Sequence, residues 1–293
     1  MGKDQQEAPF PLRSRDGIAP DVRKWRDAGQ TTRAALVVAH GMGEHADRYR
    51  APLAPIFADG VVVYALDHRG YGERARVTDT LGDYGPGGFA GVVADLTALV
   101  ELARDENPAL PLILLGHSMG SMIAQAFVLE HADLIDALAL SGSGAVDVIA
   151  SAGAADPNIF AALNTPFEPG RTGFEWLSRD AREVDLYCAD PLCGFGLVPE
   201  SFGDLFGQGA ALADTTRIAE IPQDLPIWIG SGDEDPLYSM LDAVEPLIAR
   251  YRTAGLAVET HIYPGARHEI LNETNRDEVI ADLHRWIDTI NAR

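Results

Sequence analysis

The stretch Leu110–Glu130 constrains the fold of this chain more than any other. A short apolar run, Leu112–Leu115, leads into Gly116-His117-Ser118-Met119-Gly120, and a second apolar run at helical spacing, Met122–Leu129, follows. A strand, a sharp turn with serine at its apex and a helix form the G-x-S-x-G nucleophile elbow, in which small neighbours leave room for a strained serine backbone. The alternative is a serine that only caps a helix. Ser118 is therefore a candidate nucleophile if the chain also supplies a base and an acid.

Apolar runs alternate with helical patterns on both sides of this unit, which predicts an α/β fold. The expected order is a mostly parallel eight-stranded sheet flanked by helices, with right-handed crossovers. Two edge strands, Phe10–Arg15 and Asp21–Arg26, are expected to meet at an Asp16-Gly17 hairpin, and residues 1–8 are expected to be a disordered lead-in. The other expected strands are 34–39, 61–66, 112–115, 134–140, 226–230 and 258–263, and the helices are 48–57, 89–104, 240–253 and 276–290.

The alternation fails between residues 145 and 222, which predicts a lid inserted into the core. The expected domains are therefore a first core part (1–144), a lid (145–222) and a second core part (223–293). Short helices are expected at 159–163, 173–177 and 181–187. Apolar side chains in the lid could form a substrate pocket or only pack the lid onto the core; they are Phe160, Leu163, Phe167, Phe174, Trp176, Leu177, Phe195, Phe202 and Phe206.

Composition excludes several functions. The net charge of −21 and the pI near 4.6 argue against binding to nucleic acid or to anionic membranes. No apolar run was found with the roughly 20 residues of a membrane span, and the N-terminal residues lack the apolar centre of a signal peptide. We therefore expect a cytoplasmic protein without stable membrane insertion. The two cysteines, Cys188 and Cys193, do not suit a zinc site, and we expect both thiols to pack in the lid.

The base and its carboxylate should follow strand ends, because functional groups of parallel sheets gather at the carboxyl edge. Among the eight histidines, His268 lies in the loop after the last expected strand and is the best-placed general base, with a solvated loop histidine as the alternative on position alone. The loop after the 226–230 strand offers Asp233, Glu234 and Asp235 as the orienting acid. Position alone leaves the choice between Asp233 and Asp235 open. The chain order serine, acid, histidine is the order that follows an elbow of this kind.

An oxyanion hole needs two backbone N–H groups aimed at the developing charge. One should come from Met119, directly after the candidate nucleophile. The other should come from the loop after the 34–39 strand, where His40-Gly41-Met42-Gly43 places the amide of Met42. A plain glycine turn is the alternative for that loop. Neither a dinucleotide-binding nor a Walker A motif occurs, so no cofactor and no metal are expected.

At these residues the sequence resembles the α/β-hydrolase superfamily, and within it the monoacylglycerol lipase and lysophospholipase branch, whose members are often filed as serine aminopeptidase-like hydrolases. The matching segments are HGMGEH (40–45), DHRGYG (67–72), GHSMG (116–120), ADPLCGF (189–195), SGDEDP (231–236) and YPGARHEILNE (263–273). The resemblance implies a catalytic triad of Ser118, Asp235 and His268, with Met42 and Met119 as oxyanion donors. One departure is Glu73-Arg74, where relatives often have a small residue.

The function implied is hydrolysis of carboxylic esters of acyl chains, of the monoacylglycerol or lysophospholipid type, through an acyl-serine intermediate. A short-chain carboxylesterase or an aminopeptidase could use the same triad, because a fold does not fix a function. Acidic side chains of the lid, if they lined the pocket, would favour an amine-bearing substrate; they are Glu168, Glu175, Asp180, Glu183 and Asp185. A ligand-binding protein without catalysis is a remote alternative, because no triad member is missing.

Overall fold

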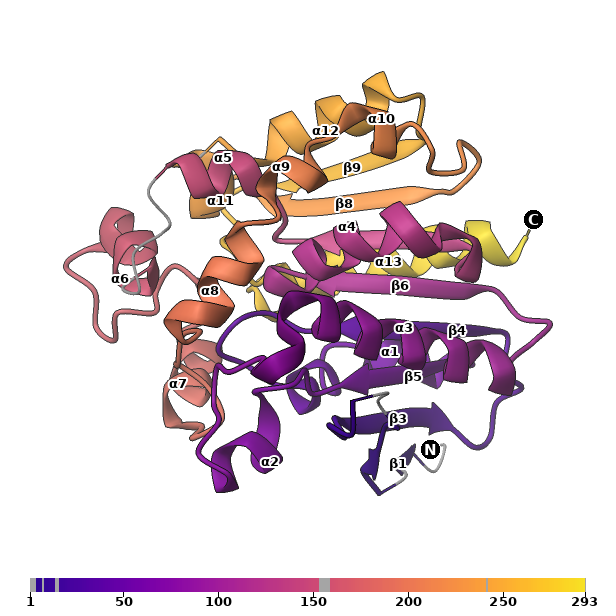
Figure 1. Cartoon of the computed structure of the whole chain (residues 1–293). Helices are drawn as coiled ribbons and strands as arrows, with labels where there is room; N and C mark the ends of the chain where they lie inside the picture. The colour runs from indigo at the N-terminus through magenta and orange to yellow at the C-terminus, as the bar shows by residue number, and fades with distance from the viewer. Residues whose placement is uncertain (1–3, 7, 14–15, 153–158, 241, 293) are drawn as a thin grey trace.

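The computed structural model describes residues 4–6, 8–13, 16–152, 159–240 and 242–292. Within these residues the strands form one mixed sheet in the order β1-β3-β5-β4-β6-β7-β8-β9, and the short β2 also pairs with β3 (Figure 1). The pairs from β5 through β9 are parallel, and those that involve β1, β2 and β3 are antiparallel. The strands are β1 (Asp4–Gln6), β2 (Phe10–Pro11), β3 (Asp21–Asp27), β4 (Ala34–Ala39), β5 (Val61–Leu66), β6 (Leu112–His117), β7 (Ala137–Ser141), β8 (Ile227–Gly232) and β9 (Val258–Tyr263).

The predicted mostly parallel, eight-stranded α/β sheet is confirmed along the main path, and the differences lie at its antiparallel edge. Asp4–Gln6, expected to be disordered, pairs with β3 as strand β1. The strand expected at Phe10–Arg15 is reduced to β2, in which Pro11 has no N–H to donate to a ladder. Residues 14 and 15 lie outside the described residues.

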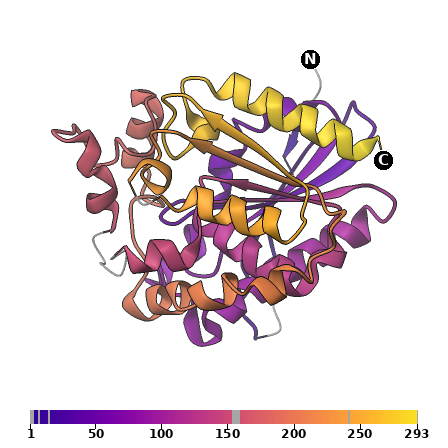
Figure 2. The same ribbon diagram turned by 90° about the horizontal axis from the view of Figure 1, so that it is seen from above.

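Helices cover both faces of the sheet (Figures 1 and 2). On one face lie α3 (Gly88–Glu106), α4 (Met119–His131) and α12 (Val244–Thr253), whose buried side chains join a core cluster with the sheet. On the other lie α1 (Ala54–Ala58) and α13 (Arg276–Asn291), in a second cluster. Strands β4, β5 and β6 are fully buried between these layers, as their continuous apolar sequences predict, whereas β9 at the edge of the sheet is only half-buried.

Two helix predictions need correction. The helix expected at 48–57 is split into a 3-10 turn at Ala46–Tyr49 and the short α1, because Pro52 and Pro55 remove amide donors from its middle. The helix expected at 240–253 begins only at Val244 and follows a separate short helix, α11 (Pro236–Ser239). A further helix, α2 (Gly72–Val77), lies where no helix was expected, and 3-10 turns lie at Gly85–Gly87, Ala132–Leu134 and Ile270–Asn272.

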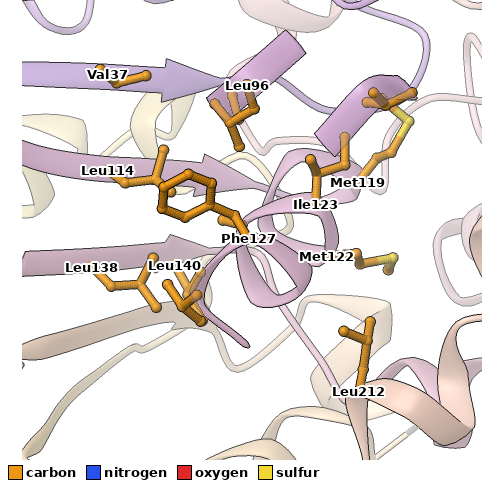
Figure 3. Close-up of a cluster of buried hydrophobic side chains, with 14 of the residues drawn as sticks. Val37, Leu96, Leu114, Met119, Met122, Ile123, Phe127, Leu138, Leu140 and Leu212 are labelled. Atoms are coloured by element: carbon orange, nitrogen blue, oxygen red, sulfur yellow. The ribbon is translucent and has the colours of Figure 1, made fainter. Parts of the chain in front are cut away.

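Helix α4 fixes the elbow by burying most of its length against the sheet (Figure 3). Phe127 of α4 lies among Leu114 of β6, Leu138 and Leu140 of β7 and Leu96 of α3, and all five side chains are essentially inaccessible to solvent. Burial of a phenylalanine side chain contributes about 2–3 kcal/mol. The helix that starts directly after the candidate nucleophile also contacts β4, so it is held against β6 and both of its neighbours in the sheet.

Helix α3 shows how length and hydropathy alone can mislead. Gly85–Glu106 spans 22 residues and is long and apolar enough to cross a membrane, which the sequence analysis did not single out. In this structure it is a core helix, because Val92, Leu96, Leu99 and Val100 are buried in the cluster that also contains residues of the sheet.

The segment 145–222, called the inserted segment below, connects β7 to β8. Its first helices lie beyond one end of the sheet, and its last helix lies beside α12 (Figure 1). It contains α5 (Val146–Ser151), α6 (Ile159–Asn164), a 3-10 turn (Thr165–Phe167), α7 (Ala181–Ala189), α8 (Pro199–Phe206), α9 (Gly209–Leu212) and α10 (Thr215–Ile218). Residues 153–158 lie outside the described residues. The helix expected at 173–177 is absent from them: the Glu175 carboxylate accepts the amides of Arg171, Thr172 and Gly173, which holds a compact turn instead.

Candidate active site

The elbow predicted around Ser118 is present. Ser118 lies between the end of β6 and the start of α4 with φ 52° and ψ −121°, a conformation that is costly for a residue with a side chain. The flanking glycines permit it. A Cβ atom on Gly120 would lie 2.0 Å from the carbonyl oxygen of Ala39, and one on Gly116 would lie 2.6 Å from the carbonyl oxygen of Gly120. Strand, turn and helix can approach this closely only because both positions are glycine.

His268 and Asp235 are brought together by the loops after β9 and β8. His268 Nδ1 lies 2.9 Å from Asp235 Oδ2, and both side chains are buried. The other oxygen of Asp235 accepts the amide of Leu237, which fixes the carboxylate at the start of α11. Asp233 instead accepts the amide of Gly265, so the structure distinguishes the two aspartates that position in the sequence left open.

The surroundings of His268 favour its protonated form. Burial works against the imidazolium, but the charge and hydrogen bond of Asp235, helped by Glu269 and Glu44, outweigh it and raise the pKa of His268 above 6.5. The ring centroid of His117, the residue before the candidate nucleophile, lies 4.9 Å from that of His268. Burial, together with the nearby His268, lowers the pKa of His117 to about 4. Nothing in the sequence indicated this contact between the two histidines.

Ser118 and His268 line the same pocket, but Ser118 makes no hydrogen bond to the imidazole. His268 Nε2 is buried and has no partner among the described residues. A nucleophile–base hydrogen bond is often long before substrate binds, so the geometry is compatible with a proton transfer that tightens on binding.

The two amides predicted for an oxyanion hole flank Ser118. Met119 begins α4, and Met42 lies in the turn after β4; both residues line the pocket. Within the described part of the chain, neither backbone N–H donates a hydrogen bond to the protein. Gly41, which directly precedes Met42, is close to the nucleophile, because a Cβ atom on Gly41 would lie 3.2 Å from Ser118 Cβ. These two donors are thus available to a ligand.

A buried ion network supports this loop, and the sequence analysis did not find it. Arg48 binds Glu269 with both ends of its guanidinium, at 2.6 and 2.7 Å, and also binds Glu44 at 2.7 Å. Glu44 in turn accepts the amide of Gly41 at 2.6 Å and the hydroxyl of Tyr49 at 2.7 Å. The network thereby joins the loop after β4 to the residue next to His268. Its partners are up to 221 residues apart, so no local pattern could have revealed it.

The rest of the pocket is mostly apolar. From the inserted segment it receives Ile149, Phe160, Leu163, Trp176, Leu177 and Phe206, and from the core Met122 and Leu237. The other aromatic residues proposed from the sequence pack elsewhere: Phe167 lies under the guanidinium of Arg267, Phe174 against Tyr187, and Phe195 against Tyr71, while Phe202 contacts Phe206. Five of the predicted lid residues therefore line the pocket.

Two groups of described side chains bring three potential metal ligands within 4.8 Å of one another. His45, Asp190 and Cys193 form one; in the other, Asp59 and Asp288 already bind Arg33, a cation that opposes a metal ion there. Neither group includes a residue that lines the pocket. Both thiols are free: Cys193 is half-buried as expected, whereas Cys188 is exposed and does not pack in the segment as predicted.

Comparison with known proteins places this geometry in a family. A family model described as serine aminopeptidase, S33, matches residues 30–275. The chain belongs to the S33 family. Within it, the chain is 33% identical over 258 residues to a monoacylglycerol lipase of Mycolicibacterium smegmatis, covering 87% of this chain and 88% of the relative. It is 32% identical over 281 residues to a monoglyceride lipase of Rattus norvegicus, covering 93% and 88%.

Solved structures share the fold of this chain. A thermostable carboxyl esterase from Bacillus coagulans in complex with glycerol superposes with a TM-score of 0.83 at 28% identity, covering 99% of each chain. A variant of the monoglyceride lipase of Saccharomyces cerevisiae superposes with a TM-score of 0.73 at 23% identity, covering 99% of this chain and 96% of that one, and supports the fold alone. The α/β-hydrolase fold expected from the sequence is thereby confirmed.

Proposed function

We propose that this S33 protein is a serine hydrolase that cleaves carboxylic esters of acyl chains, of the monoacylglycerol or lysophospholipid type. The observation that carries the proposal is the shared pocket: Ser118, the unpartnered Nε2 of His268 and two unused backbone amides meet an apolar lining. The names of the relatives, which are monoacylglycerol and monoglyceride lipases, support the ester class.

In the proposed mechanism, His268 Nε2 takes the proton of the Ser118 hydroxyl while Ser118 Oγ attacks the ester carbonyl. Asp235 holds the Nδ1–H tautomer and stabilises the imidazolium. The amides of Met42 and Met119 hold the oxyanion of the tetrahedral intermediate. His268 then gives the proton to the leaving alkoxide, and the alcohol departs. Water repeats the sequence on the acyl-serine, releasing the carboxylic acid and restoring the serine.

The apolar lining favours an acyl chain. Phe160, Leu163, Leu177, Met122 and Leu237 offer hydrocarbon to whatever lies beside Ser118. Each methylene removed from water contributes about 0.8 kcal/mol, so a longer acyl chain should bind more tightly until the pocket is filled. The role of residues 145–222 as a lid, the division into core parts 1–144 and 223–293, and a cytoplasmic location stay predictions.

An aminopeptidase would need a free carboxylate for the substrate ammonium, and the pocket does not favour one. Its described carboxylates are Glu44 and Glu269, and both are already bound by Arg48. The acidic residues of the inserted segment that could have favoured an amine do not line the pocket. Glu175, for example, binds backbone amides of its own turn. We therefore rank the ester above the amide.

The test is hydrolysis of p-nitrophenyl esters of increasing acyl length by the wild type, by Ser118→Ala and by Ser151→Ala as a matched control on the exposed end of α5. We expect turnover to peak at medium or long chains, to disappear in Ser118→Ala and to persist in Ser151→Ala. Turnover on the acetate and butyrate esters alone would support Ser118 as the nucleophile but would contradict a preference for longer acyl chains. A folded wild type that hydrolyses none of these esters would contradict the proposal that the protein is an ester hydrolase.

A further inference from the structure

Trp176 lines the pocket and, like His268, has a buried side-chain nitrogen without a partner among the described residues. Its side chain is 3% exposed, and its indole Nε1 has no acceptor among the described residues. Of the described residues that line the pocket, only His268 shares this property. Buried N–H groups are rarely left without a partner, and each exception calls for an explanation, such as a catalytic role or a bound molecule that supplies the missing atom.

The indole is held in place and cannot easily turn its N–H toward solvent. The backbone amide of Trp176 donates to Asn164 Oδ1 at 3.0 Å, and its carbonyl accepts the amide of His268 at 3.3 Å. The centroid of the indole ring lies 4.8 Å from that of the His268 ring and 5.8 Å from that of the Phe160 ring, on which the indole is stacked. A donor fixed in this way loses little freedom when it binds an acceptor.

The contact between Trp176 and His268 indicates which part of a substrate would lie beside the indole. If the proposed function holds, His268 Nε2 protonates the leaving alkoxide, so the alcohol part must lie against the imidazole. The alcohol part is then next to Trp176 as well. The indole N–H finds no acceptor on the apolar side chains around it, which are Phe160, Leu163 and Leu177.

We infer that Trp176 is a specificity residue whose indole N–H donates to a hydroxyl or ether oxygen on the alcohol part of the ester. This inference rests on the proposed function and narrows it to esters of short polyols or similar oxygen-bearing alcohols. A site with a buried donor rejects a substrate that lacks the matching acceptor, because the donor then loses water without gaining a bond. Plain alkyl esters are therefore the poorer substrates.

The experiment compares two esters with the same acyl chain, 1-decanoylglycerol and propyl decanoate, which differ by the two hydroxyl groups of the alcohol. The variants are Trp176→Phe, which keeps an aromatic ring on His268 but removes the N–H, and Trp228→Phe. Trp228 also has a buried Nε1 without a partner, but it does not line the pocket. The acidic limb of the pH–rate profile is recorded for each variant, because a ring that acts only by positioning His268 would change it.

We expect the wild type to prefer the glyceryl ester. Trp176→Phe should lower kcat/KM about tenfold on the glyceryl ester, leave the propyl ester and the acidic limb unchanged, and so abolish most of the preference; Trp228→Phe should change neither ester. Three results would overturn the inference: an equal loss of kcat/KM on both esters, no loss on either ester, or a wild type that has no preference between them. The third result decides the question even if the variant fails to fold. Hydrolysis of the propyl ester in those cases would leave the proposed function standing, whereas a folded wild type inactive on both esters would overturn both proposals.

Discussion

At the scale of single residues, the pKa of His268 decides when the proposed base can act. Only the neutral imidazole accepts the serine proton, and Asp235 raises the pKa of that imidazole above 6.5. The rate should therefore fall as the pH drops through a value above 6.5, and the acidic limb of kcat/KM against pH would measure it.

Asp235→Asn should shift that limb to lower pH, because burial would then lower the pKa of His268 without opposition. It should also reduce kcat by about 10³- to 10⁴-fold through loss of the correct tautomer. Asp233→Asn is the matched control, since Asp233 binds Gly265 rather than the imidazole. If both variants moved the limb equally, the pairing of His268 with Asp235 would not be what sets it.

The residues that carry a local signature could be predicted from the sequence. Ser118 stands in a pattern that needs only its own strand and helix, and His268 follows the last strand. Asp235 needed either the fold or a family resemblance, because Asp233 has the same chemistry two residues away. Trp176 gave no signal beyond its apolarity, because only the packed pocket shows that its N–H has no partner.

At the scale of elements, the close crossing of α4 over β4 depends on Gly120. A Cβ atom there would meet the backbone of Ala39 at 2.0 Å and that of His40 at 2.5 Å, and backbone atoms cannot move aside cheaply. Gly120→Ala should lower the free energy of unfolding by about 3 kcal/mol, at the upper end for overpacking. At the exposed position 203 of helix α8, the Cβ atom of Gly203→Ala would meet nothing within 4 Å, and the variant should gain about 0.5–1 kcal/mol of stability. Urea unfolding of both variants measures this, and equal effects would contradict the crossing.

The ion network around Arg48 gives a second prediction for elements. Burial raises the pKa of Glu44, but Arg48 and the nearby histidines hold it at about 2. Because the folded pKa lies below 4.5, Glu44 stabilises the fold above pH 4.5, and this contribution is lost as the pH falls toward 2. Without Arg48, the buried Glu44 would lose the charge that does most to lower its pKa, and its carboxylate would destabilise the fold at neutral pH.

Arg48→Met should therefore lower the free energy of unfolding by about 3–5 kcal/mol at pH 7, and the difference from the wild type should shrink as the pH falls below 4.5. Arg182→Met, at an exposed position of α7, is the control and should change stability little. Urea unfolding at several pH values measures both. A deficit of Arg48→Met that is the same at pH 7 and pH 4 would show that lost packing, and not unpaired charge, is responsible.

Helix and strand predictions succeeded where the pattern was continuous and failed where side chains compete for the backbone. The strand at 258–263 and the helix from Arg276 match the structure. The helix expected at 173–177 is replaced by a turn, since the Glu175 carboxylate folds back to accept the backbone amides of Arg171, Thr172 and Gly173. Such competition depends on geometry that a periodic pattern does not contain.

At the scale of the whole molecule, negative charges greatly outnumber positive ones. The chain has 44 acidic side chains and 23 Lys and Arg side chains, so the negative charges exceed the positive ones by 44 − 23 = 21. Their repulsion opposes the compact state, and dissolved salt screens it. Adding about 0.5 M sodium chloride should raise the Tm by a few degrees. A Tm that falls with salt in a calorimetric scan would show that the ion pairs outweigh the repulsion.

The attachment of the inserted segment to the loop of His268 has a consequence for protein engineering. The carbonyls of Trp176 and Leu177 accept the amides of His268 and Glu269, and the buried Glu273 binds Arg179. A chimera that exchanged residues 145–222 for those of a relative would therefore replace part of the support of its own base. Shuffling of substrate specificity within this family should treat 174–180 and 267–273 as one inherited unit.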